Sequence, residues 1–408
     1  MRRAPTRRLV TALLALSTLV PLSLTSSAAQ AAPPRTAFTA VDPYAVDPRA
    51  DDCPPDGLDP ALVARLDKAI EATRKEAGVP GVTVGLWLPG RGSYIRSTGV
   101  ADKKTRAPMT PDLNMRIGSE TKTFTATAVL ELVDRGLVRL DKPISTYLHG
   151  VPDGEHITVR QMLEMRSGLF SYTFDQDFVH DLLSDPTRQF TPKELLAYAF
   201  RHPNVFAPGT QFQYSNTNYI LLGLLVEKLG KMPLAEFIRR YVTGPAHMEH
   251  TLLPKGAEFP SPHAHGYTNQ TLTGAVADTT DWNPSWGWAA GAMVSTLQDL
   301  RKWAKVVATG ELLSPATQAQ REKFIPVPNF DGAGYGLGLF TTHGWVGHNG
   351  SLPGYESVTM YLPEQKATMV ILLNTDILHD GSEPSTLIAK AVTSIITPKN
   401  VYELPAEG

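Results

Sequence analysis

A serine and a lysine three residues apart form the first pair of side chains that could do chemistry together. Ser119 and Lys122 lie in IGSETKTFTA, residues 117–126, where helix-forming sequence begins. Positions i and i+3 share one face of a helix, so the amine would lie beside the hydroxyl. A neutral hydroxyl needs a base within hydrogen-bond reach, and the positive helix end favours loss of the lysine proton. The spacing therefore predicts a nucleophile and its base; the alternative is two ordinary surface residues.

A tyrosine and an asparagine two positions apart form the second candidate pair. Tyr214 and Asn216 lie in FAPGTQFQYSNTNY, where a turn precedes a helix. Beside a cationic lysine the phenol is a candidate proton acceptor, and the asparagine amide could hold both the lysine and a substrate carbonyl. Alternatively, the tyrosine packs in the core and the asparagine caps the helix. The same pattern recurs at residues 267–269, in loop-like sequence with no helix behind it.

The third candidate is His348-Asn349-Gly350, in VGHNGSLPGY between two strand-like runs. A glycine on a strand permits the close approach of a ligand, and a histidine there could steer charge or hydrogen-bond the phenol. The alternative is a structural histidine. A similar triplet at residues 379–381 lies in a polar loop. The sequence contains S-x-x-K only at Ser119–Lys122, and the usual competing pattern, a G-x-S-x-G nucleophile elbow, is absent.

The elements around these motifs predict one sheet built from both ends of the chain. Residues 59–78 have the apolar spacing of a helix, and 80–90 and 92–102 indicate a hairpin. Toward the C-terminus the apolar period becomes two, so residues 334–374 indicate consecutive strands before a last helix over about 384–396. Strands at both ends with helices between them favour an antiparallel sheet that the two termini close.

The middle of the chain is rich in helical patterns and is predicted to form an inserted all-helical domain over about 131–285. The segments with helical spacing are 123–136, 158–168, 191–200, 218–230 and 233–242. The central serine and lysine stand at the start of the first of these helices. The main domain is expected over 59–398, with residues 399–408 as a C-terminal tail.

The N-terminus predicts export. Residues 1–31 combine four arginines, an apolar run of about 16 residues and an Ala-Gln-Ala cleavage site, which is typical of a secretory signal peptide. A membrane anchor is the alternative, but a spanning helix needs about 20 apolar residues. Residues 32–58 are rich in proline and predict an extended leader. We therefore expect a secreted protein with no stable membrane anchor.

Composition excludes several classes of function. Removing residues 1–31 takes away four arginines and no acid, which changes the formal net charge from −2 to −6 and favours no nucleic-acid partner. Cys53 is the chain's one cysteine, so no intramolecular disulfide forms. The histidine pairs at 247 and 250 and at 263 and 265 lack a third ligand for zinc. We expect neither a metal nor another cofactor.

Together, S-x-x-K, Y-x-N and H-x-G in this order resemble the serine β-lactamase and penicillin-binding protein family. The sequence is most similar to the branch that holds actinomycete D-alanyl-D-alanine carboxypeptidases, class C β-lactamases and related esterases and D-amino-acid peptidases. The resemblance covers about residues 60–398, including TVRQMLEMRSGL, GAMVSTLQDL and GYGLGL. It implies an α/β (α+β) fold of the β-lactamase/D,D-peptidase type: an antiparallel sheet flanked by helices plus the inserted helical domain.

The resemblance also implies a role for each candidate. Ser119 would be acylated, and Lys122 and Tyr214 would share the proton relay, with the choice of base left open. His348 would occupy a place that many relatives fill with lysine. The backbone N–H groups of Ser119 and Ser351 would form the oxyanion hole. The implied substrate-binding residues are Asn216, Trp286 in PSWGWAAG, Asn349, Gly350 and Ser351.

Two departures from the branch bear on the substrate. Asn349 replaces the threonine of H-T-G, and Phe340 stands where the carboxypeptidases carry an arginine that grips the terminal carboxylate. No arginine follows Arg321 in the sequence, although an arginine fork is the usual carboxylate partner.

The function expected from the sequence is a secreted serine hydrolase that works through an acyl-enzyme. A D-alanyl-D-alanine carboxypeptidase-like peptidase is the first expectation. An esterase or D-amino-acid amidase or peptidase is the second, a β-lactamase the third, and a non-catalytic penicillin-binding sensor the last. The expected partners are a small peptide or ester substrate and β-lactams as acylating inhibitors.

Overall fold

A computed structural model describes residues 57–404. The predicted signal peptide at 1–31, Cys53 and all but the last two residues of the predicted leader lie outside this range. Within it, none of the helices has the length and apolar character needed to cross a membrane.

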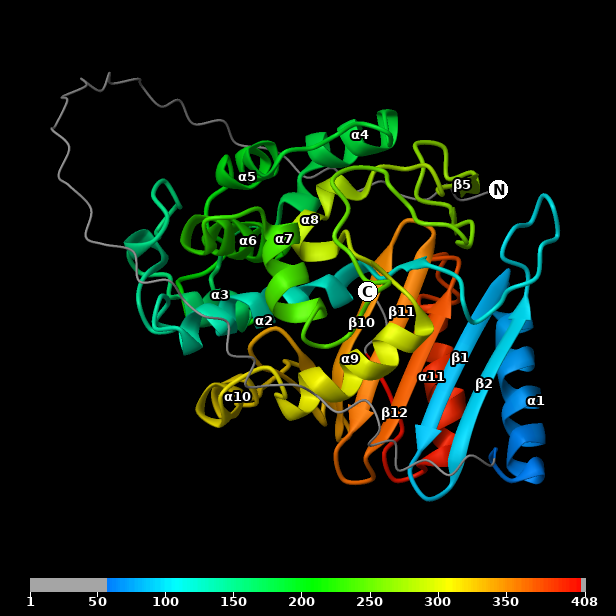
Figure 1. Cartoon of the computed structure of the whole chain (residues 1–408). Coiled ribbons are helices and arrows are strands. Elements are labelled where there is room, and N and C mark those ends of the chain that lie inside the picture. The colour runs from blue at the N-terminus through cyan, green and yellow to red at the C-terminus, as the bar shows by residue number, and fades with distance from the viewer. Residues whose placement is uncertain (1–56, 405–408) are drawn as a thin grey trace, which may run out of the picture. The chain divides into compact units, whose positions relative to one another are not determined.

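One eight-stranded antiparallel sheet forms the centre of the fold (Figure 1). Its strand order is β2-β1-β12-β11-β10-β9-β8-β7. The first hairpin of the chain therefore pairs with its last strand, with Val84 opposite Ile371. The prediction of one sheet closed by the two termini is confirmed. The strands are β1 (Gly81–Leu88), β2 (Gly92–Gly99), β7 (Ile325–Pro326), β8 (Ala333–Tyr335), β9 (Phe340–Thr342), β10 (Trp345–Leu352), β11 (Tyr355–Leu362) and β12 (Ala367–Leu373).

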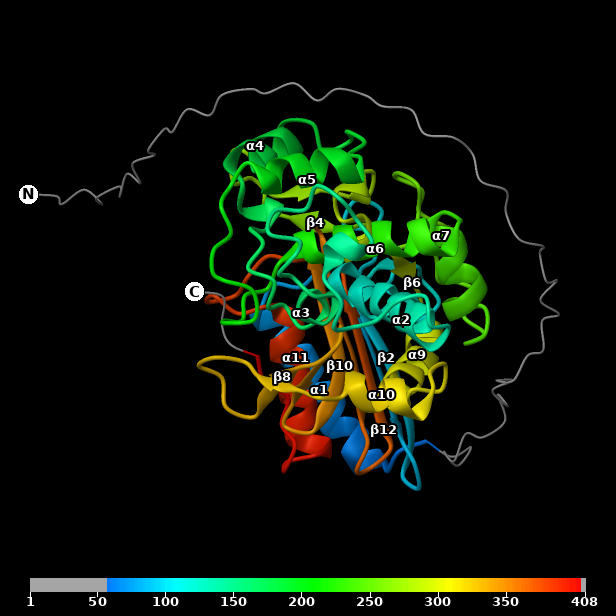
Figure 2. The same ribbon diagram turned by 90° about the vertical axis from the view of Figure 1, so that its left-hand side faces the viewer.

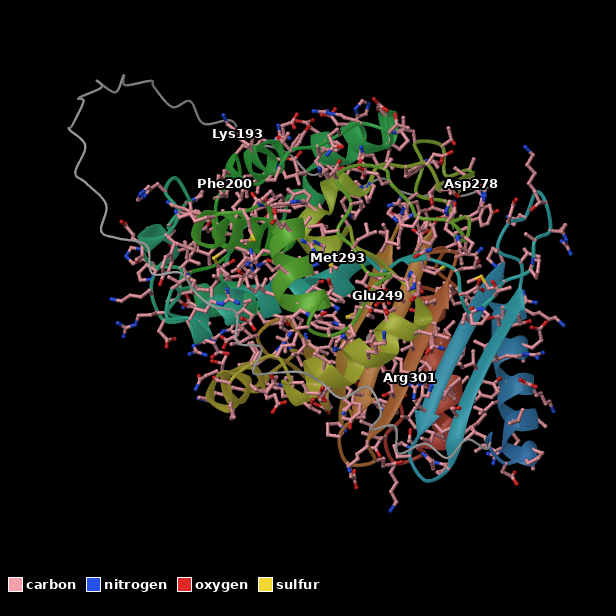
Figure 3. The ribbon with its side chains drawn as sticks, in the orientation of Figure 1. Lys193, Phe200, Glu249, Asp278, Met293 and Arg301 are labelled. Carbon is pink, nitrogen blue, oxygen red and sulfur yellow. The ribbon has the colours of Figure 1, made fainter. Side chains whose placement is uncertain are left out.

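Helices cover both faces of this sheet. In Figure 1, α9 (Leu297–Thr309) crosses in front of β11 and β12, whereas α11 (Pro384–Ile396) and α1 (Pro60–Glu76) lie behind the strands. Every residue of β1, β11 and β12 is buried, as expected for strands covered on both sides. Arg301 of α9 lies over the Trp87 ring of β1, 4.8 Å from its centroid (Figure 3).

Most of the remaining helices lie toward one end of the sheet, whereas the last of them in the chain, residues 315–321, lies at the level of the strands (Figure 2). These remaining helices are α2 (Thr121–Asp134), α3 (Val159–Leu163), α4 (Gln176–Ser184), α5 (Pro192–Phe200), α6 (Asn216–Gly230), α7 (Leu234–Ile238), α8 (Trp288–Gly291) and α10 (Pro315–Arg321). Two short strands, β4 (Tyr267–Thr268) and β5 (Ala277–Asp278), also fall in the predicted all-helical insert, and β3 (Met115–Arg116) pairs with β6 (Val294–Ser295) outside it. The helix predicted over 158–168 ends at Leu163, since Met165 has a left-handed φ of 60°.

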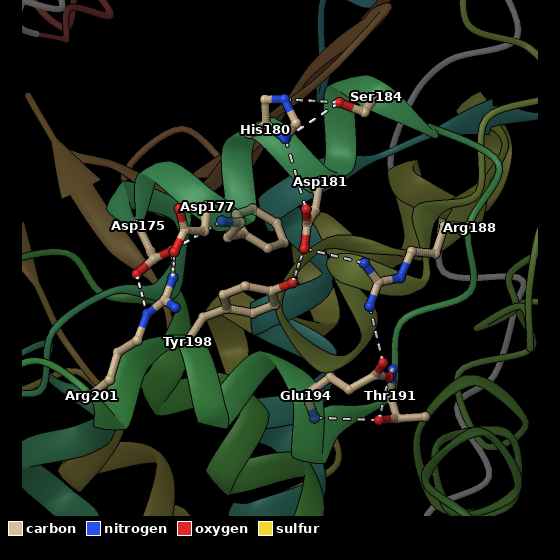
Figure 4. Close-up of polar contacts among 11 residues, drawn as sticks. Asp175, Asp177, His180, Asp181, Ser184, Arg188, Thr191, Glu194, Tyr198 and Arg201 are labelled. Atoms are coloured by element: carbon tan, nitrogen blue, oxygen red, sulfur yellow. Dashed lines mark hydrogen bonds and ion pairs between the residues drawn. The ribbon is translucent and has the colours of Figure 1, made fainter.

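Charged contacts join α4 to α5 within the helical region. Asp175 caps the start of α4 by accepting a hydrogen bond from the Phe178 amide, and it also pairs with Arg201 beyond the end of α5. Arg188 lies between Asp181 and Glu194 at 3.2 and 3.1 Å (Figure 4). These contacts fix the two helices against each other at the molecular surface.

Two glycines allow a short helical turn, η1 (Gly118–Glu120), to lie directly against β10. Gly118 has a φ of 49°, and a Cβ built on it would lie 2.7 Å from the Ser351 amide nitrogen. A Cβ on Gly350 would lie 1.9 Å from the Ile117 carbonyl oxygen. Only residues without a side chain permit this approach, which brings Ser119 beside β10.

The chain continues to pack beyond residue 398, where the sequence predicted a tail. The Trp345 indole donates a hydrogen bond of 2.8 Å to the Asn400 carbonyl, and the Tyr402 amide donates one of 2.9 Å to Thr393. The Tyr402 side chain is fully buried. The domain therefore extends at least to residue 404, the end of the described chain.

Tyr402→Ala should lower the free energy of unfolding by about 3 kcal/mol or more, because it removes a buried aromatic ring and leaves a cavity. Urea denaturation measures the change. The exposed neighbour Lys399 provides the control, and Lys399→Ala should change stability by less than about 0.5 kcal/mol. Equal stability of the two variants would show that residues 399–404 are the tail that the sequence predicted.

Gly350→Ala should cost about 1–3 kcal/mol of stability, because the added methyl group would overlap the Ile117 carbonyl and force η1 away from β10. Gly291→Ala is the matched control, since its Cβ would meet its nearest neighbour, Gly118, at an ordinary 3.9 Å. Denaturant unfolding of both variants checks the expectation. An unchanged midpoint for Gly350→Ala would contradict the close approach.

Candidate active site

Ser119 and Lys122 are in direct contact. The Lys122 Nζ donates hydrogen bonds of 2.9 Å to the Ser119 Oγ and 2.8 Å to the Ala290 carbonyl. Lys122 is completely buried, and this burial holds its pKa well below the usual value for lysine. Ser119 remains half-buried. The pair thus places an amine with a lowered pKa beside an accessible hydroxyl, an arrangement that can activate a serine.

Tyr214 lies next to the same lysine. Its ring centroid is 4.7 Å from the Lys122 Nζ. The half-buried ring turns a fully shielded hydroxyl toward the site, and burial raises the pKa of Tyr214 well above its usual value while the Ser119 hydroxyl lowers it. Among the described residues, the phenol oxygen has no partner at full hydrogen-bond geometry. A contact of this kind tightens when substrate enters the site.

The structure separates the second tyrosine and histidine patterns from this site. Tyr267 lies in β4, where its hydroxyl accepts a hydrogen bond of 2.8 Å from the Lys103 amide. His379 lies in the loop before α11, with its ring 3.7 Å from Asp380. Both residues have partners away from Ser119, although Tyr267 lies in a short strand and not in the loop that its sequence surroundings predicted.

His348 lies on β10 and contacts a different phenol from the one expected. Its Nδ1 donates to the Asn349 carbonyl at 2.5 Å, and its Nε2 lies 3.2 Å from the Tyr335 hydroxyl. The ring centroid of Tyr214 is 6.3 Å away, so a direct bond to that phenol is not formed. Burial lowers the pKa of His348 to about 3, which makes the imidazole neutral at physiological pH.

The β10 strand presents a backbone edge toward Ser119. Its ladder with β9 ends at Gly347, opposite Phe340, whereas its ladder with β11 continues to Leu352. At Gly350 and Ser351 one edge of β10 therefore pairs with β11, and the other edge faces η1. The closeness of Gly118 to the Ser351 amide nitrogen places both predicted oxyanion donors in one region.

Asn216 does not make the predicted contact with the lysine. Its side-chain amide donates to the Thr173 hydroxyl at 3.3 Å, and its backbone amide donates to the Ser171 hydroxyl at 3.1 Å. The hydroxyl-bearing segment 171–174 packs against the first turn of α6 and competes for the amide. The Ala290 carbonyl takes the place expected for the asparagine beside Lys122.

Trp286 lies at a small hollow that it shares with Arg116 and Leu352. Its side chain is half-buried, and its carbonyl accepts a hydrogen bond of 2.6 Å from the Tyr172 hydroxyl. Leu352 follows Ser351 on β10, so Trp286 is near the end of the strand that passes Ser119. It does not line the larger cavity next to Tyr214.

That larger cavity has a volume of ≈ 310 Å³ and is mostly aromatic. Phe340 forms part of its wall and packs edge-on against His348, with ring centroids 5.4 Å apart. The Asn349 side-chain amide donates a hydrogen bond of 3.0 Å to Glu383, which also lines the cavity. The rings that surround the space belong to Phe212, Tyr214, Phe330, Tyr335 and Phe340.

Sequence reasoning missed two residues at this site. Tyr335 belongs to GYGLGL, which carried only the family resemblance, and its contact with His348 depends on the β8–β9–β10 pairing. Glu383 precedes Pro384 at the N-cap of α11. In the sequence, its position before a helix was the one feature that could have drawn attention to it. Within residues 57–404, no three His, Cys, Asp or Glu side chains are grouped so that they could hold a metal ion.

Comparisons with solved structures support the fold. A D-stereospecific amidohydrolase from Streptomyces sp. is 31% identical and has a TM-score of 0.71 over 77% of this chain and 94% of its own. The D-amino acid amidase from Ochrobactrum anthropi SV3, solved with D-phenylalanine, is 28% identical with a TM-score of 0.75. That match covers 83% of this chain and 99% of the amidase.

Curated relatives extend the similarity to penicillin-binding proteins. Protein flp of Staphylococcus aureus strain N315 is 27% identical over 76% of this chain, which spans 62% of that relative's length. The putative penicillin-binding protein PbpX of Bacillus subtilis strain 168 is 24% identical over 68% of this chain and 66% of its own. The Beta-lactamase family model matches residues 66–393. With its mixed α/β fold, the chain therefore belongs to the Beta-lactamase family, which its similarity to a penicillin-binding protein homologue and to D-amino acid amidases supports.

Proposed function

We propose that this protein is an exported amidohydrolase that forms an acyl-enzyme on Ser119 and prefers amides of D-amino acids. The observation that carries the proposal is the contact between the Ser119 hydroxyl and the buried Lys122 amine. The neighbouring D-stereospecific amidohydrolase and D-amino acid amidase support the substrate class. Export rests on the signal-like sequence of residues 1–31, which lie outside the described residues.

We infer the proton transfers from the positions of Lys122 and Tyr214 and from the opposite effects of burial on them. Burial lowers the pKa of Lys122 and raises that of Tyr214, which favours the neutral form of each. Lys122 then accepts the Ser119 proton as Oγ bonds to the substrate carbonyl carbon. Tyr214 donates its proton to the leaving nitrogen as the C–N bond breaks, and Lys122 returns the serine's proton to Tyr214. A water molecule attacks the acyl-enzyme by the reverse relay and restores Ser119.

The backbone supplies the electrostatic part of this mechanism. The N–H groups of Ser119 and Ser351 would bind the oxygen that gains negative charge in the tetrahedral intermediate. Removing one such donor costs about 3–4 kcal/mol in a typical oxyanion hole. Asn216 and Trp286 are the proposed contacts for the acyl part of the substrate, and neutral His348 positions Tyr335 and the strand edge at Gly350 without adding charge.

A D-alanyl-D-alanine carboxypeptidase-like activity is the second candidate. The similarity to the putative penicillin-binding protein PbpX favours it. We rank the carboxypeptidase activity second because of the cavity wall. A substrate carboxylate would meet Phe340 and Glu383 there, and not the cationic side chain that usually binds it. An esterase activity would follow from the same acyl-enzyme chemistry, since an ester is the more reactive acyl donor.

The wild type should hydrolyse D-phenylalanine amide at least tenfold faster than the L-enantiomer, by kcat/KM, and Ser119→Ala should abolish turnover. Released ammonia measures the rates, and intact mass spectrometry with a β-lactam should show an adduct on wild type alone. Tyr214→Phe should lower kcat about a hundredfold or more because it removes the proposed proton donor. Tyr267→Phe is the matched control and should retain activity.

Two outcomes separate the candidates. Near-normal activity of Ser119→Ala would overturn the acyl-enzyme proposal altogether. A preference of the wild type for an acyl-D-Ala-D-Ala acid over its C-terminal amide would favour the carboxypeptidase. In that comparison Phe340→Arg should gain activity toward the acid by about ten- to a hundredfold if Phe340 occupies the carboxylate position.

His348 should remain neutral between pH 5 and 8, because burial lowers its pKa to about 3. Nitrogen-detected NMR of the imidazole checks this. The exposed His156 is the titrating control, because its hydrogen bond to Asp153 raises its pKa. Since the folded pKa lies below that of the unfolded chain, the stability contributed by His348 falls as the pH drops from about 6.5 toward 3. A His348 titration near pH 6.5 would contradict the buried, neutral state.

A further inference from the structure

The cavity beside Tyr214 adjoins the side of the site from which a leaving group departs. In the proposed mechanism Tyr214 gives its proton to the leaving atom, and the Tyr214 ring forms part of the cavity wall. The strand residues His348 and Asn349 form another part, close to the Ser351 amide. A group attached to the leaving atom would therefore extend into this space, whose ≈ 310 Å³ is within the usual range for small-molecule sites.

The wall of this cavity favours positive charge. Among the described residues that line it, Glu383 is the one acid, and lysine and arginine are absent. His348 contributes no charge, since burial lowers its pKa to about 3. Burial is the main reason why the pKa values of Tyr214 and Glu356 are raised, and the negative charge of Glu383 raises both further. Glu356 is buried outside the cavity wall, whereas Glu383 is half-buried and lines the cavity, so Glu383 is the acid placed to face a ligand.

Two contacts hold this carboxylate in place. The Asn349 side-chain amide donates to the Glu383 Oε2 at 3.0 Å. Glu383 also occupies the N-cap of α11, where the helix dipole favours negative charge. Asn349 is the residue that replaces the threonine of the H-T-G pattern. This replacement therefore supplies the amide that binds the Glu383 side chain.

The aromatic rings complete a cation site. A positive group near ring faces is attracted by their quadrupoles, and aromatic cages are a recurrent way to bind quaternary ammonium groups. Phe212, Phe330 and Phe340 also offer apolar surface that a strongly hydrated small ion could not use. The wall therefore fits an organic ammonium group better than an inorganic cation.

We propose that this cavity is a leaving-group subsite for organic cations, with Glu383 as the counter-ion and Asn349 as the residue that positions it. The assignment of the leaving-group side rests on the acyl-enzyme function proposed above. In the reaction the Ser119 Oγ–carbonyl bond forms and the bond to the leaving oxygen or nitrogen breaks. The departing atom takes its proton from Tyr214 and leaves as a cationic alcohol or amine.

Matched esters test the subsite. N-acetyl-D-phenylalanine esters of choline and of 3,3-dimethylbutan-1-ol have leaving groups of the same shape, with and without positive charge. The wild type should favour the choline ester by about ten- to a hundredfold in kcat/KM, after correction for the spontaneous hydrolysis rates. In Glu383→Gln the ratio of kcat/KM for the choline ester to that for the neutral ester should fall to about two- to fivefold, because only the attraction of the cation to the aromatic rings remains.

The exposed Asp380 provides the matched control, because its carboxylate lies on the same loop but outside the cavity wall. Asp380→Asn should keep the wild-type ratio, and Asn349→Ala should reduce it. A wild-type ratio near one, or a ratio that Glu383→Gln leaves unchanged, would overturn the proposal.

A binding measurement separates this proposal from the function on which it rests. Calorimetry with choline and with 3,3-dimethylbutan-1-ol needs no turnover and should show weaker choline binding in Glu383→Gln. If choline binds in this way while no amide is cleaved, the cation site stands and the amidohydrolase assignment fails. If D-amino-acid amides are cleaved but choline does not bind more tightly than its neutral analogue, the function stands and the subsite is wrong.

Discussion

The site depends on keeping a lysine amine away from water. Lys122 is fully buried, and its two hydrogen-bond partners are a hydroxyl and a carbonyl, neither of which carries a compensating negative charge. The charged form is therefore disfavoured. The same enclosure that lowers the pKa of the amine raises that of the Tyr214 phenol. One buried pocket thus favours the uncharged form of both groups, the form in which an amine can accept a proton and a phenol can donate one.

The fold supplies this pocket by bringing together segments that are distant in sequence. Lys122 comes from α2, Ala290 from α8, Tyr214 from the turn before α6 and Ser351 from β10. Gly118 and Gly350 let η1 and β10 approach without side chains between them. The nucleophile is thereby fixed directly beside the backbone of β10.

Most elements of the fold followed from local patterns, whereas the contacts within the site did not. The helix around Lys122 and the strands from residue 333 onward have clear apolar periods, so their existence was predictable. The Tyr335–His348 contact and the Asn349–Glu383 bond depend on which strands pair and on where α11 begins. The spacing of apolar residues along the sequence does not show which strands pair. Asn216 shows the reverse case, since its motif was recognisable but nearby hydroxyls redirected its amide.

The pairing of β1 with β12 governs how the chain can fold. These neighbouring central strands are separated by almost the entire described chain, and Tyr402 closes the core only a few residues from its end. The sheet is therefore built from contacts of long sequence separation, which slow folding because chain entropy must be lost before the strands pair. A chain that ended before β12 would lack one of the two strands that pair with β1, so the sheet can be completed only when the last segment is available.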